Sequence, residues 1–306
     1  MPSKTLDATI GDAGASASPI SVSGPSASPT GDPWLLTPGP LTTSPTVKQA
    51  MLHDYGSRDS HFIEVNRRVR AKLLEIIEDQ AGDFVSVPMQ GSGTFAVEAM
   101  LGTFLPRDGK VLVLVNGAYG QRILKICHYL GREAVVQETP EDTPPDLAAL
   151  ESALAADPAI GHVVAVHCET TSGILNPIEA IAAVVAAQGR RLLIDAMSAF
   201  GAIPLSSKDV PFDAVAASSN KCLEGVPGMG FCLARRSALT ACEGNAHSLA
   251  LDLHDQWMAM EKNAQWRFTP PTHCILAFDQ AISEFEAEGG VTGRNRRYSD
   301  NCRILV

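Results

Sequence analysis

Short apolar runs alternate with amphipathic stretches over most of this chain, and this alternation limits the folds that it can form. Seven runs have the pattern of strands, at residues 84–88, 110–115, 134–136, 162–167, 191–195, 213–217 and 230–234. Helical patterns lie at 61–80, 94–104, 119–130, 146–155 and 177–188. Runs rich in Val, Leu and Ile that are joined by helices are typical of a mainly parallel sheet covered on both faces. We therefore predict an α/β fold with a seven-stranded sheet.

The chain divides into three predicted parts. Its 306 residues leave room for one full catalytic domain and part of a second. Residues 1–33 are dominated by Ser, Ala, Pro and Gly, and we expect a disordered extension because such a segment buries too little apolar surface. Residues 34–260 form the large domain that holds the sheet. Residues 261–306 are helical and mixed in character, and we expect them to begin a smaller domain.

Composition excludes several classes of function. A formal net charge of -10 argues against non-specific binding to nucleic acid, which needs a basic face. No apolar run reaches the roughly 18 residues that a membrane span needs. The seven cysteines occur singly, without a CxxC pair or a Cys/His metal spacing, so we expect reduced thiols and no metal site. The N-terminus has no apolar stretch of the secretory type, and we expect a cytoplasmic protein.

Lys221 lies in an unusual loop. It follows the apolar run 213–217 within SSNKCLEGVPGMGF, where glycines and a proline replace the usual charged neighbours. Lysine is almost never fully buried unless something pairs with it. The aldehyde of a cofactor would explain this lysine, because a desolvated amine loses its proton more readily and becomes nucleophilic. The alternative is an ordinary surface lysine in the loop after a strand.

Asp195 ends the apolar run RLLID, about one helix-and-strand unit before Lys221. Ligands of open α/β sheets bind at the carboxyl ends of the strands, so we expect both residues at one edge of the sheet. An aspartate there can hold a proton on a ring nitrogen or ligate a cation. No second convincing carboxylate lies near it in the sequence, although magnesium stays the competing interpretation.

The segment GSGTFAVEAM at 91–100 follows one strand and opens an amphipathic helix. Its glycines allow a ligand to approach the backbone, and Ser92 and Thr94 add hydroxyls beside the free N–H groups of the helix start. This arrangement favours an anion, such as the phosphate of a cofactor. The segment matches neither GxxxxGK[ST] nor GxGxxG. A glycine-rich turn with Ser or Thr as the helix cap explains it equally well.

Two further loops at this edge carry aromatic or hydroxyl side chains. Tyr119 lies in NGAYGQR, where it can stack on a planar ring or pack against the core at a helix start. Glu169, Thr170 and Thr171 lie in HCETTSGILNP. The threonine hydroxyls can bind a phenolic oxygen or cap the following helix. We expect His167, at the start of the same segment, to be a hydrogen-bonded residue at a strand end and not a catalytic base.

One sheet edge therefore offers an anion cradle, an aromatic ring, hydroxyls, an aspartate and a lysine. The cofactor that needs all five is pyridoxal 5'-phosphate. Its phosphate would lie in the cradle, its ring against Tyr119, its pyridinium nitrogen at Asp195 and its aldehyde at Lys221.

In these and the neighbouring stretches, the chain resembles the class V, fold-type I aminotransferases. The resembling stretches run from about residue 35 to 275 and are LLTPGPLTTS, DYGSRD, QGSGTFAVEA, NGAYGQR, HCETTSGILNP, LLIDAMSAFGA, SSNKCLEGVPGMGF and WRFTPPTH. The resemblance implies Lys221 as the residue that forms the Schiff base with the cofactor and Asp195 as the partner of the pyridinium. It also implies a C-terminal domain of α+β type, of which this chain would hold only the beginning.

The same resemblance implies roles for seven other residues. Ser92, Gly93 and Thr94 would bind the phosphate, with Asn220 beside it. Tyr119 would stack on the ring, and Thr170 would lie near the phenolic oxygen. Thr269 would reach the phosphate of the neighbouring subunit, because these enzymes resemble one another in forming homodimers with shared sites.

The implied reaction is transamination, with 2-aminoethylphosphonate and pyruvate as small-molecule substrates and with phosphonoacetaldehyde and L-alanine as products. Members of the family continue well past residue 306, and the arginine that binds the carboxylate or phosphonate of the substrate is expected there. We assign this role to none of Arg294, Arg296 and Arg297.

Three alternatives stay open. The first is an alanine– or serine–glyoxylate aminotransferase with the same cofactor residues. The second is a lyase or hydrolase that uses a Schiff-base lysine without a cofactor. The third is a truncated fragment that binds the cofactor without turnover.

Overall fold

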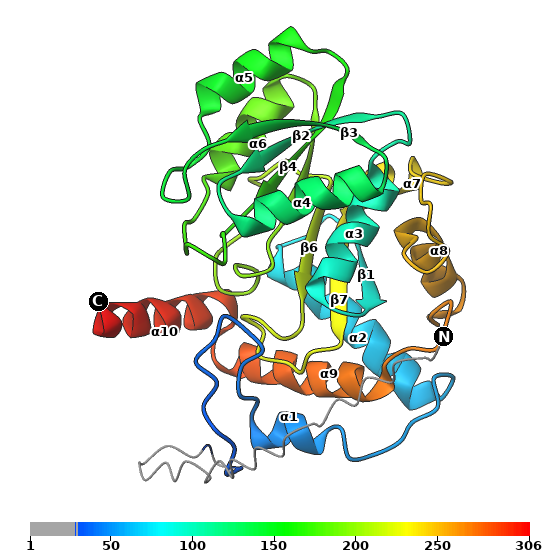
Figure 1. The fold of residues 1–306 in the computed structure, drawn as a ribbon. Coiled ribbons are helices and arrows are strands. Elements are labelled where there is room, and N and C mark those ends of the chain that lie inside the picture. The colour runs from blue at the N-terminus through cyan, green and yellow to red at the C-terminus, as the bar shows by residue number, and fades with distance from the viewer. Residues whose placement is uncertain (1–27, 29) are drawn as a thin grey trace, which may run out of the picture.

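A seven-stranded sheet forms the centre of the computed structural model, which describes residues 28 and 30–306 (Figure 1). Most of the extension predicted at 1–33 therefore lies outside the described residues. The strands are β1 (Phe84–Gln90), β2 (Lys110–Val115), β3 (Glu133–Glu138), β4 (Ile160–Val166), β5 (Arg191–Asp195), β6 (Ala214–Ser218) and β7 (Met229–Arg235). Their spatial order is β1-β7-β6-β5-β4-β2-β3.

All strand pairs are parallel except those of β7, which runs antiparallel to both β1 and β6. The mainly parallel, seven-stranded α/β sheet predicted from the sequence is confirmed. The central strands are buried along nearly their whole length, as expected for strands covered on both faces. The outermost strand β3 is more exposed and correspondingly more polar.

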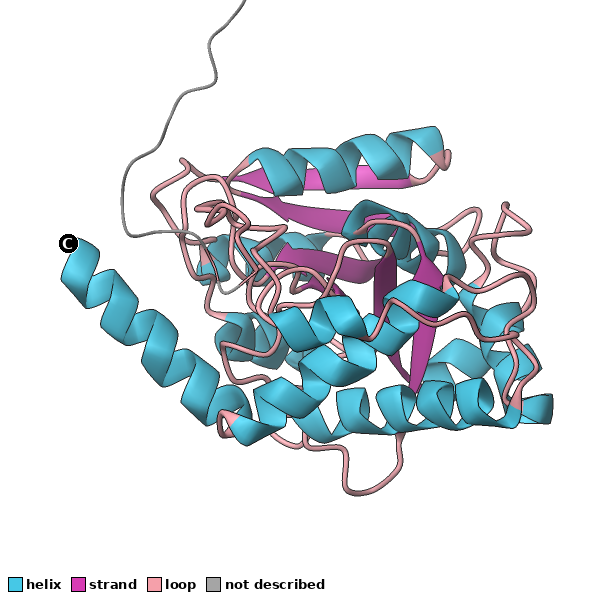
Figure 2. Cartoon of the chain, turned by 90° about the horizontal axis from the view of Figure 1, so that it is seen from below, coloured by secondary structure: helices cyan, strands magenta, loops and turns pink. Residues whose placement is uncertain are grey.

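Helices cover both faces of the sheet (Figures 1 and 2). The helices of the described residues are α1 (Pro45–Gln49), α2 (Ser60–Ile76), α3 (Gly93–Phe104), α4 (Ala118–Tyr129), α5 (Leu147–Ala156), α6 (Ile178–Ala187), α7 (Arg236–Thr240), α8 (Leu253–Asn263), α9 (Thr272–Ala287) and α10 (Gly290–Leu305). Helices α3, α4, α7 and α8 share one apolar core with one face of the sheet. Helices α1, α2, α5, α6 and α9 share the other.

The segment 261–306 ends α8 and then forms α9 and α10, and it contains no strand. Helix α9 packs along α2 and buries Ile275, Phe278 and Phe285 in the core of the sheet domain. Helix α10 projects from the body of the protein (Figures 1 and 2), and its last residues are exposed. The predicted domain boundary at residue 260 stays a prediction.

The topology brings the carboxyl ends of the parallel strands to one edge. Asp195 closes β5, and β5 pairs in parallel with β6, which leads into the loop of Lys221. The same edge receives the start of α4, which carries Tyr119, and the loop after β4, which carries Thr170. Within the described part of the chain, no helix is long and apolar enough to cross a membrane.

Candidate active site

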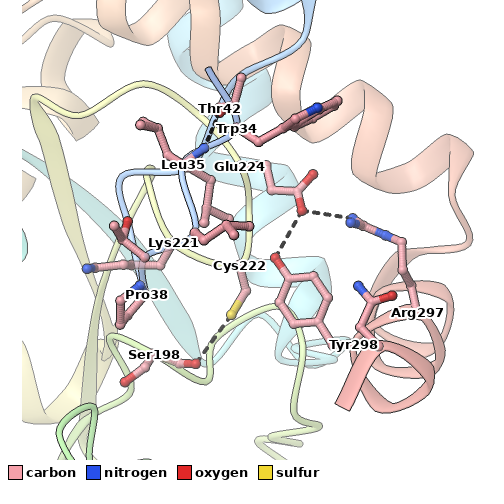
Figure 3. A pocket seen from close by; sticks show the side chains of 14 residues that line it. Trp34, Leu35, Pro38, Thr42, Ser198, Lys221, Cys222, Glu224, Arg297 and Tyr298 are labelled. Atoms are coloured by element: carbon pink, nitrogen blue, oxygen red, sulfur yellow. Dashed lines mark hydrogen bonds and ion pairs between the residues drawn. The ribbon is translucent and has the colours of Figure 1, made fainter. Parts of the chain in front are cut away.

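Lys221 lines a cavity of about 540 Å³ (Figure 3). Its Nζ donates a hydrogen bond to the carbonyl oxygen of Gly39 at 3.1 Å. The cavity is lined by the 34–42 loop, by Ser198 and by residues of α10. The side chain is half-buried and forms no ion pair among the described residues. The amine is therefore available to a ligand in this cavity.

The loop that carries Lys221 is fixed by its own hydrogen bonds. The hydroxyl of Ser219 donates to the carbonyl oxygens of Val226 at 2.6 Å and Met229 at 3.1 Å. The backbone N–H of Glu224 donates to the carbonyl oxygen of Lys221 at 2.8 Å. These bonds close a tight turn, so the position of the lysine backbone is well defined.

Asp195 is only 3% exposed, and burial raises the pKa of its carboxyl to about 6. The negative charge of Glu169 also raises this pKa, whereas the backbone N–H of Met197 and the charges of Arg122 and Lys221 lower it. The N–H of Met197 donates to Oδ1 at 2.9 Å. The other oxygen, Oδ2, has no hydrogen-bond partner among residues 28 and 30–306. A buried carboxylate with a free oxygen suits a cationic N–H donor.

The GSGT segment opens α3, with Ser92 as the residue that precedes the first turn. The hydroxyl of Ser92 forms no capping bond, and its side chain is exposed. Within the described residues, the backbone N–H groups of Gly93 and Thr94 have no acceptor. The positive end of the helix dipole lies at these same groups. The segment thus keeps the donors that an anion requires.

Gly93 lies against the side chain of Met197, which follows Asp195 by two residues. A Cβ atom at Gly93 would lie 2.2 Å from Sδ of Met197, so only glycine fits without displacing the methionine. Gly93, Thr94, Tyr119 and Asp195 line one small hollow of about 20 Å³. The structure therefore brings together four of the residues that the sequence proposed for the cofactor.

Tyr119 is the second residue of α4 and lies beside the guanidinium of Arg122, whose Cζ is 4.4 Å from the centre of the tyrosine ring. Arg122 also donates to the hydroxyl of Thr94 at 3.3 Å. The carboxylate of Glu169, which is fully buried, accepts the backbone N–H groups of Tyr119 and Gly120. Glu169 thus holds the start of α4 from the opposite loop.

Thr170 connects to the lysine loop through Ser198. The hydroxyls of Thr170 and Ser198 lie 2.6 Å apart, and Ser198 donates to the carbonyl oxygen of Cys168 at 2.8 Å. The carbonyl oxygen of Ser198 accepts the thiol of Cys222 at 3.3 Å. Ser198 therefore links the loop after β4 to the residue that follows Lys221 (Figure 3).

Two of the proposed cofactor residues are placed differently. Asn220 lies next to Lys221 and is half-buried, and its carbonyl oxygen faces Gly39. Thr269 is exposed and lines two other hollows, of about 500 Å³ and 320 Å³, neither of which includes Lys221. Its predicted contact with a neighbouring subunit stays a prediction.

His167 is 5% exposed, and burial lowers the pKa of its imidazole to about 4. Its backbone N–H donates to the carbonyl oxygen of Asp195 at 2.7 Å. It is thus a buried strand-end residue. In the part of the chain that the structure describes, Asp195 belongs to no group of three or more potential metal ligands.

No role for Arg122, Ser198 or Glu169 was predicted from the sequence. Arg122 follows Tyr119 by one helical turn, and this spacing was the available signal for it. The contacts of Ser198 and Glu169 join loops that are far apart in the chain. Nothing in the local pattern indicates such contacts.

The sheet order, the lysine after β6 and the buried aspartate at the end of β5 are the features of a fold-type I aminotransferase. A model of the aminotransferase class-V family matches residues 46–297. The chain belongs to the class-V aminotransferase family.

Known proteins of this family are similar over most of the chain. A relative from Pseudomonas putida, named 2-aminoethylphosphonate–pyruvate transaminase, is 58% identical over 274 residues, which cover 90% of this chain and 74% of the relative. A relative of the same name from Pseudomonas aeruginosa has the same identity and coverage. Among solved structures, pyridoxamine–pyruvate aminotransferase from Mesorhizobium loti superposes with a TM-score of 0.78 at 26% identity, covering 86% of this chain and 67% of that structure's chain.

Proposed function

We propose that this protein transfers the amino group of 2-aminoethylphosphonate to pyruvate with pyridoxal 5'-phosphate as cofactor, giving phosphonoacetaldehyde and L-alanine. The observation that carries the proposal is the placement of the Lys221 amine and the Asp195 carboxylate after adjacent parallel strands. The names of relatives that are 57–58% identical over 90% of the chain support the choice of substrates.

The residues at this edge fit the proposed cofactor. Asp195 is a buried residue and offers one carboxylate oxygen without a partner in the described chain, which suits a pyridinium N–H. The start of α3 offers N–H groups without an acceptor among the described residues and two hydroxyls for a phosphate. A large cavity leads to the Lys221 amine, which suits an aldehyde. The pyridinium, the phosphate and the aldehyde of the cofactor would thus each meet a matching group of the protein.

When bound, pyridoxal phosphate supplies an electron sink for the carbanion of the substrate. Lys221 would hold the cofactor covalently and, once released by the incoming amine, would move a proton from the substrate carbon through Nζ. Asp195 would keep a proton on the ring nitrogen of the cofactor. Burial strengthens this interaction, because few water molecules compete for the carboxylate.

The remaining residues bind and orient. Ser92, Gly93 and Thr94 would hold the phosphate, with Asn220 beside it. Tyr119 would support one face of the ring, and its loop is fixed by Glu169. Thr170, which shares a hydrogen bond with Ser198, would bind the phenolic oxygen.

We further propose a cytoplasmic homodimer in which Thr269 contacts the phosphate bound by the partner subunit. Thr269 is exposed and does not line the Lys221 cavity, which supports a role outside its own subunit. The oligomeric state can be measured by sedimentation of the purified protein. A monomer that binds the cofactor as tightly as its relatives would contradict this part of the proposal.

The function is tested by incubating the purified protein and pyridoxal phosphate with 2-aminoethylphosphonate and pyruvate, and measuring L-alanine. Lys221→Ala should abolish alanine formation and the visible absorbance of the bound cofactor. Lys208→Ala is the matched control, since this exposed lysine pairs with Glu78 and precedes β6, whose other end leads to Lys221.

Three other outcomes would each point elsewhere. Faster turnover of alanine or serine with glyoxylate would support the glyoxylate aminotransferase alternative. Bound cofactor without turnover would support a binding fragment. Turnover without cofactor, unaffected by Asp195→Asn, would support a Schiff-base lyase or hydrolase.

A further inference from the structure

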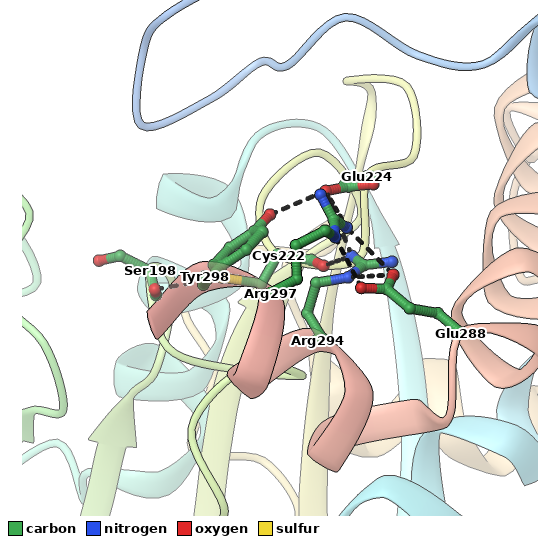
Figure 4. Close-up of polar contacts among 7 residues, drawn as sticks. All are labelled: Ser198, Cys222, Glu224, Glu288, Arg294, Arg297 and Tyr298. Atoms are coloured by element: carbon green, nitrogen blue, oxygen red, sulfur yellow. Dashed lines mark hydrogen bonds and ion pairs between the residues drawn. The ribbon is translucent and has the colours of Figure 1, made fainter. Parts of the chain in front are cut away.

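Four charged side chains gather where α10 meets the lysine loop (Figure 4). Arg294 is 2% exposed, and its Nε lies 2.8 Å from Oε2 of Glu288. Arg297 pairs with Oε1 of Glu288 at 2.6 Å and with Oε1 of Glu224 at 2.8 Å. Two arginines and two glutamates thus form one balanced cluster, which we call the α10 cluster.

The α10 cluster contacts the backbone of the lysine turn directly. The guanidinium of Arg294 donates to the carbonyl oxygen of Cys222, the residue after Lys221. The hydroxyl of Tyr298 donates to the carboxylate of Glu224 at 2.9 Å. The N–H of Glu224 in turn donates to the carbonyl oxygen of Lys221. Residues one and three positions after the lysine are therefore both held by α10.

Glu224 has a left-handed backbone, with φ of 55°. This conformation is unfavourable for a residue with a side chain, and glycine adopts it readily. A glycine at position 224 would adopt this conformation without strain, yet glycine occurs only at the next position, 225. The contacts of the Glu224 carboxylate with Arg297 and Tyr298 explain why a strained glutamate occupies the turn.

The turn is also held from the opposite side. The thiol of Cys222 donates to the carbonyl oxygen of Ser198, which belongs to the loop after β5. Cys222 thus lies between Ser198 on the sheet edge and Arg294 on α10. A shift of either contact would move the backbone next to Lys221.

We propose that Glu224 and Arg294 are positioning residues for Lys221, and that they act by holding the turn 221–224 against α10. The proposal rests on the function proposed above, in which Lys221 binds the cofactor. Neither residue needs to touch a ligand, since both act through the backbone of the turn. A displacement of about 1 Å at a reacting group can slow its reaction about a hundredfold.

The test is the rate at which Lys221 binds pyridoxal phosphate. The cofactor-free protein is mixed with pyridoxal phosphate, samples are reduced with borohydride at intervals, and the modified Lys221 peptide is measured by mass spectrometry. Glu224→Gly should slow this rate at least about tenfold, although glycine suits the backbone of the turn. Glu224→Gln keeps the hydrogen-bonding shape and should restore most of the rate.

Arg303→Gln is the matched control, since it removes a surface ion pair with Asp300 on the same helix and should leave the rate unchanged. Tyr298→Phe removes only the hydroxyl bond to Glu224 and should give an intermediate rate, and it replaces Glu224→Gly as the decisive variant if the latter does not fold. Circular dichroism and thermal unfolding identify the folded variants.

The outcomes separate the two proposals. If the wild-type protein is modified at Lys221 and the folded Glu224→Gly and Tyr298→Phe variants react at the same rate, the positioning role is overturned and the proposed function stands. If wild-type Lys221 is not modified at all, both fall. A loss of thermal stability with an unchanged rate would indicate a merely structural cluster.

Discussion

The carboxylate of Glu169 accepts the backbone N–H of Tyr119 at 3.1 Å and that of Gly120 at 3.2 Å. The two loops come from different strands, and Glu169 is fully buried between them. Gly117 makes the approach possible, since a Cβ atom there would lie 2.2 Å from Cγ of Glu169. A carboxylate at the positive end of α4 is also favoured by the helix dipole. Glu169 is therefore a structural support for the proposed ring-stacking residue.

Replacing this carboxylate should destabilise the protein. Glu169→Gln leaves one oxygen for two N–H donors and turns an amide group toward the other, so we expect a loss of about 1–3 kcal/mol in the free energy of unfolding. Urea unfolding measures the loss. Glu138→Gln is the control, because this exposed glutamate accepts a hydrogen bond from Gln121 at 2.9 Å. Equal stabilities of the two variants would contradict the role of Glu169.

Gly93 should tolerate a methyl group only if Met197 is shortened. Gly93→Ala forces its Cβ against the methionine sulfur, and overpacking of this kind costs about 1–3 kcal/mol. Met197→Ala opens space at the same place, so the double variant should lose less stability than the two single variants together. A double-mutant cycle from urea unfolding measures this coupling. Additive losses would show that the two side chains do not compete for this space.

Much of the fold could be predicted from local pattern. Each strand of the sheet begins and ends within about two residues of the apolar run that predicted it, because a buried parallel strand must be apolar on both faces. Asp195 ends one of these apolar runs and Lys221 follows another, so their places at strand ends could be predicted as well. The edge of a parallel sheet follows from the strand order, and the proposed active site lies at that edge.

The contacts that hold the site could not be predicted in this way. Glu169 and Tyr119 are 50 residues apart, and Arg294 and Cys222 are 72 residues apart. Nothing in the local sequence tells a buried, paired charge from a solvated one. Arg294 lies in the run GRNRRYSDN, which has the composition of an exposed helix, yet the packing of α10 buries it.

Asp195→Asn should have opposite effects on stability and on cofactor binding. Burial raises the pKa of Asp195 from 3.8 to about 6, so the folded protein holds this proton more tightly than the unfolded chain. The ionised carboxylate therefore destabilises the cofactor-free protein above pH 6, and this cost disappears below about pH 4. One pKa unit corresponds to about 1.4 kcal/mol, so the asparagine variant should be up to about 3 kcal/mol more stable at pH 7.

The same variant should bind pyridoxal phosphate more weakly, because asparagine offers no negative charge to a pyridinium nitrogen. Urea unfolding without cofactor and a titration with cofactor measure the two effects separately. Asp213→Asn is the control, since burial also raises the pKa of this carboxyl but the residue lies at the opposite end of β6. Weaker binding in both variants would contradict a specific role of Asp195.

His162 and His167 should make the protein sensitive to mild acid. Burial lowers the pKa of each imidazole from 6.5 to about 4, and the charge of Arg191 adds to this at His162. The unfolded chain therefore binds protons first, so the stability that these residues contribute is complete above pH 6.5 and is lost as the pH falls to about 4. The loss is up to about 3 kcal/mol for each histidine.

A variant with leucine at both positions should lose less stability over this range than the wild type, whereas His53→Leu, at an exposed position, should behave as the wild type does. The contribution of Asp195 is common to all three proteins and cancels in the comparison. Urea unfolding at pH 7, 5.5 and 4 measures the difference, and parallel curves for the wild type and the double variant would rule out this source of acid sensitivity.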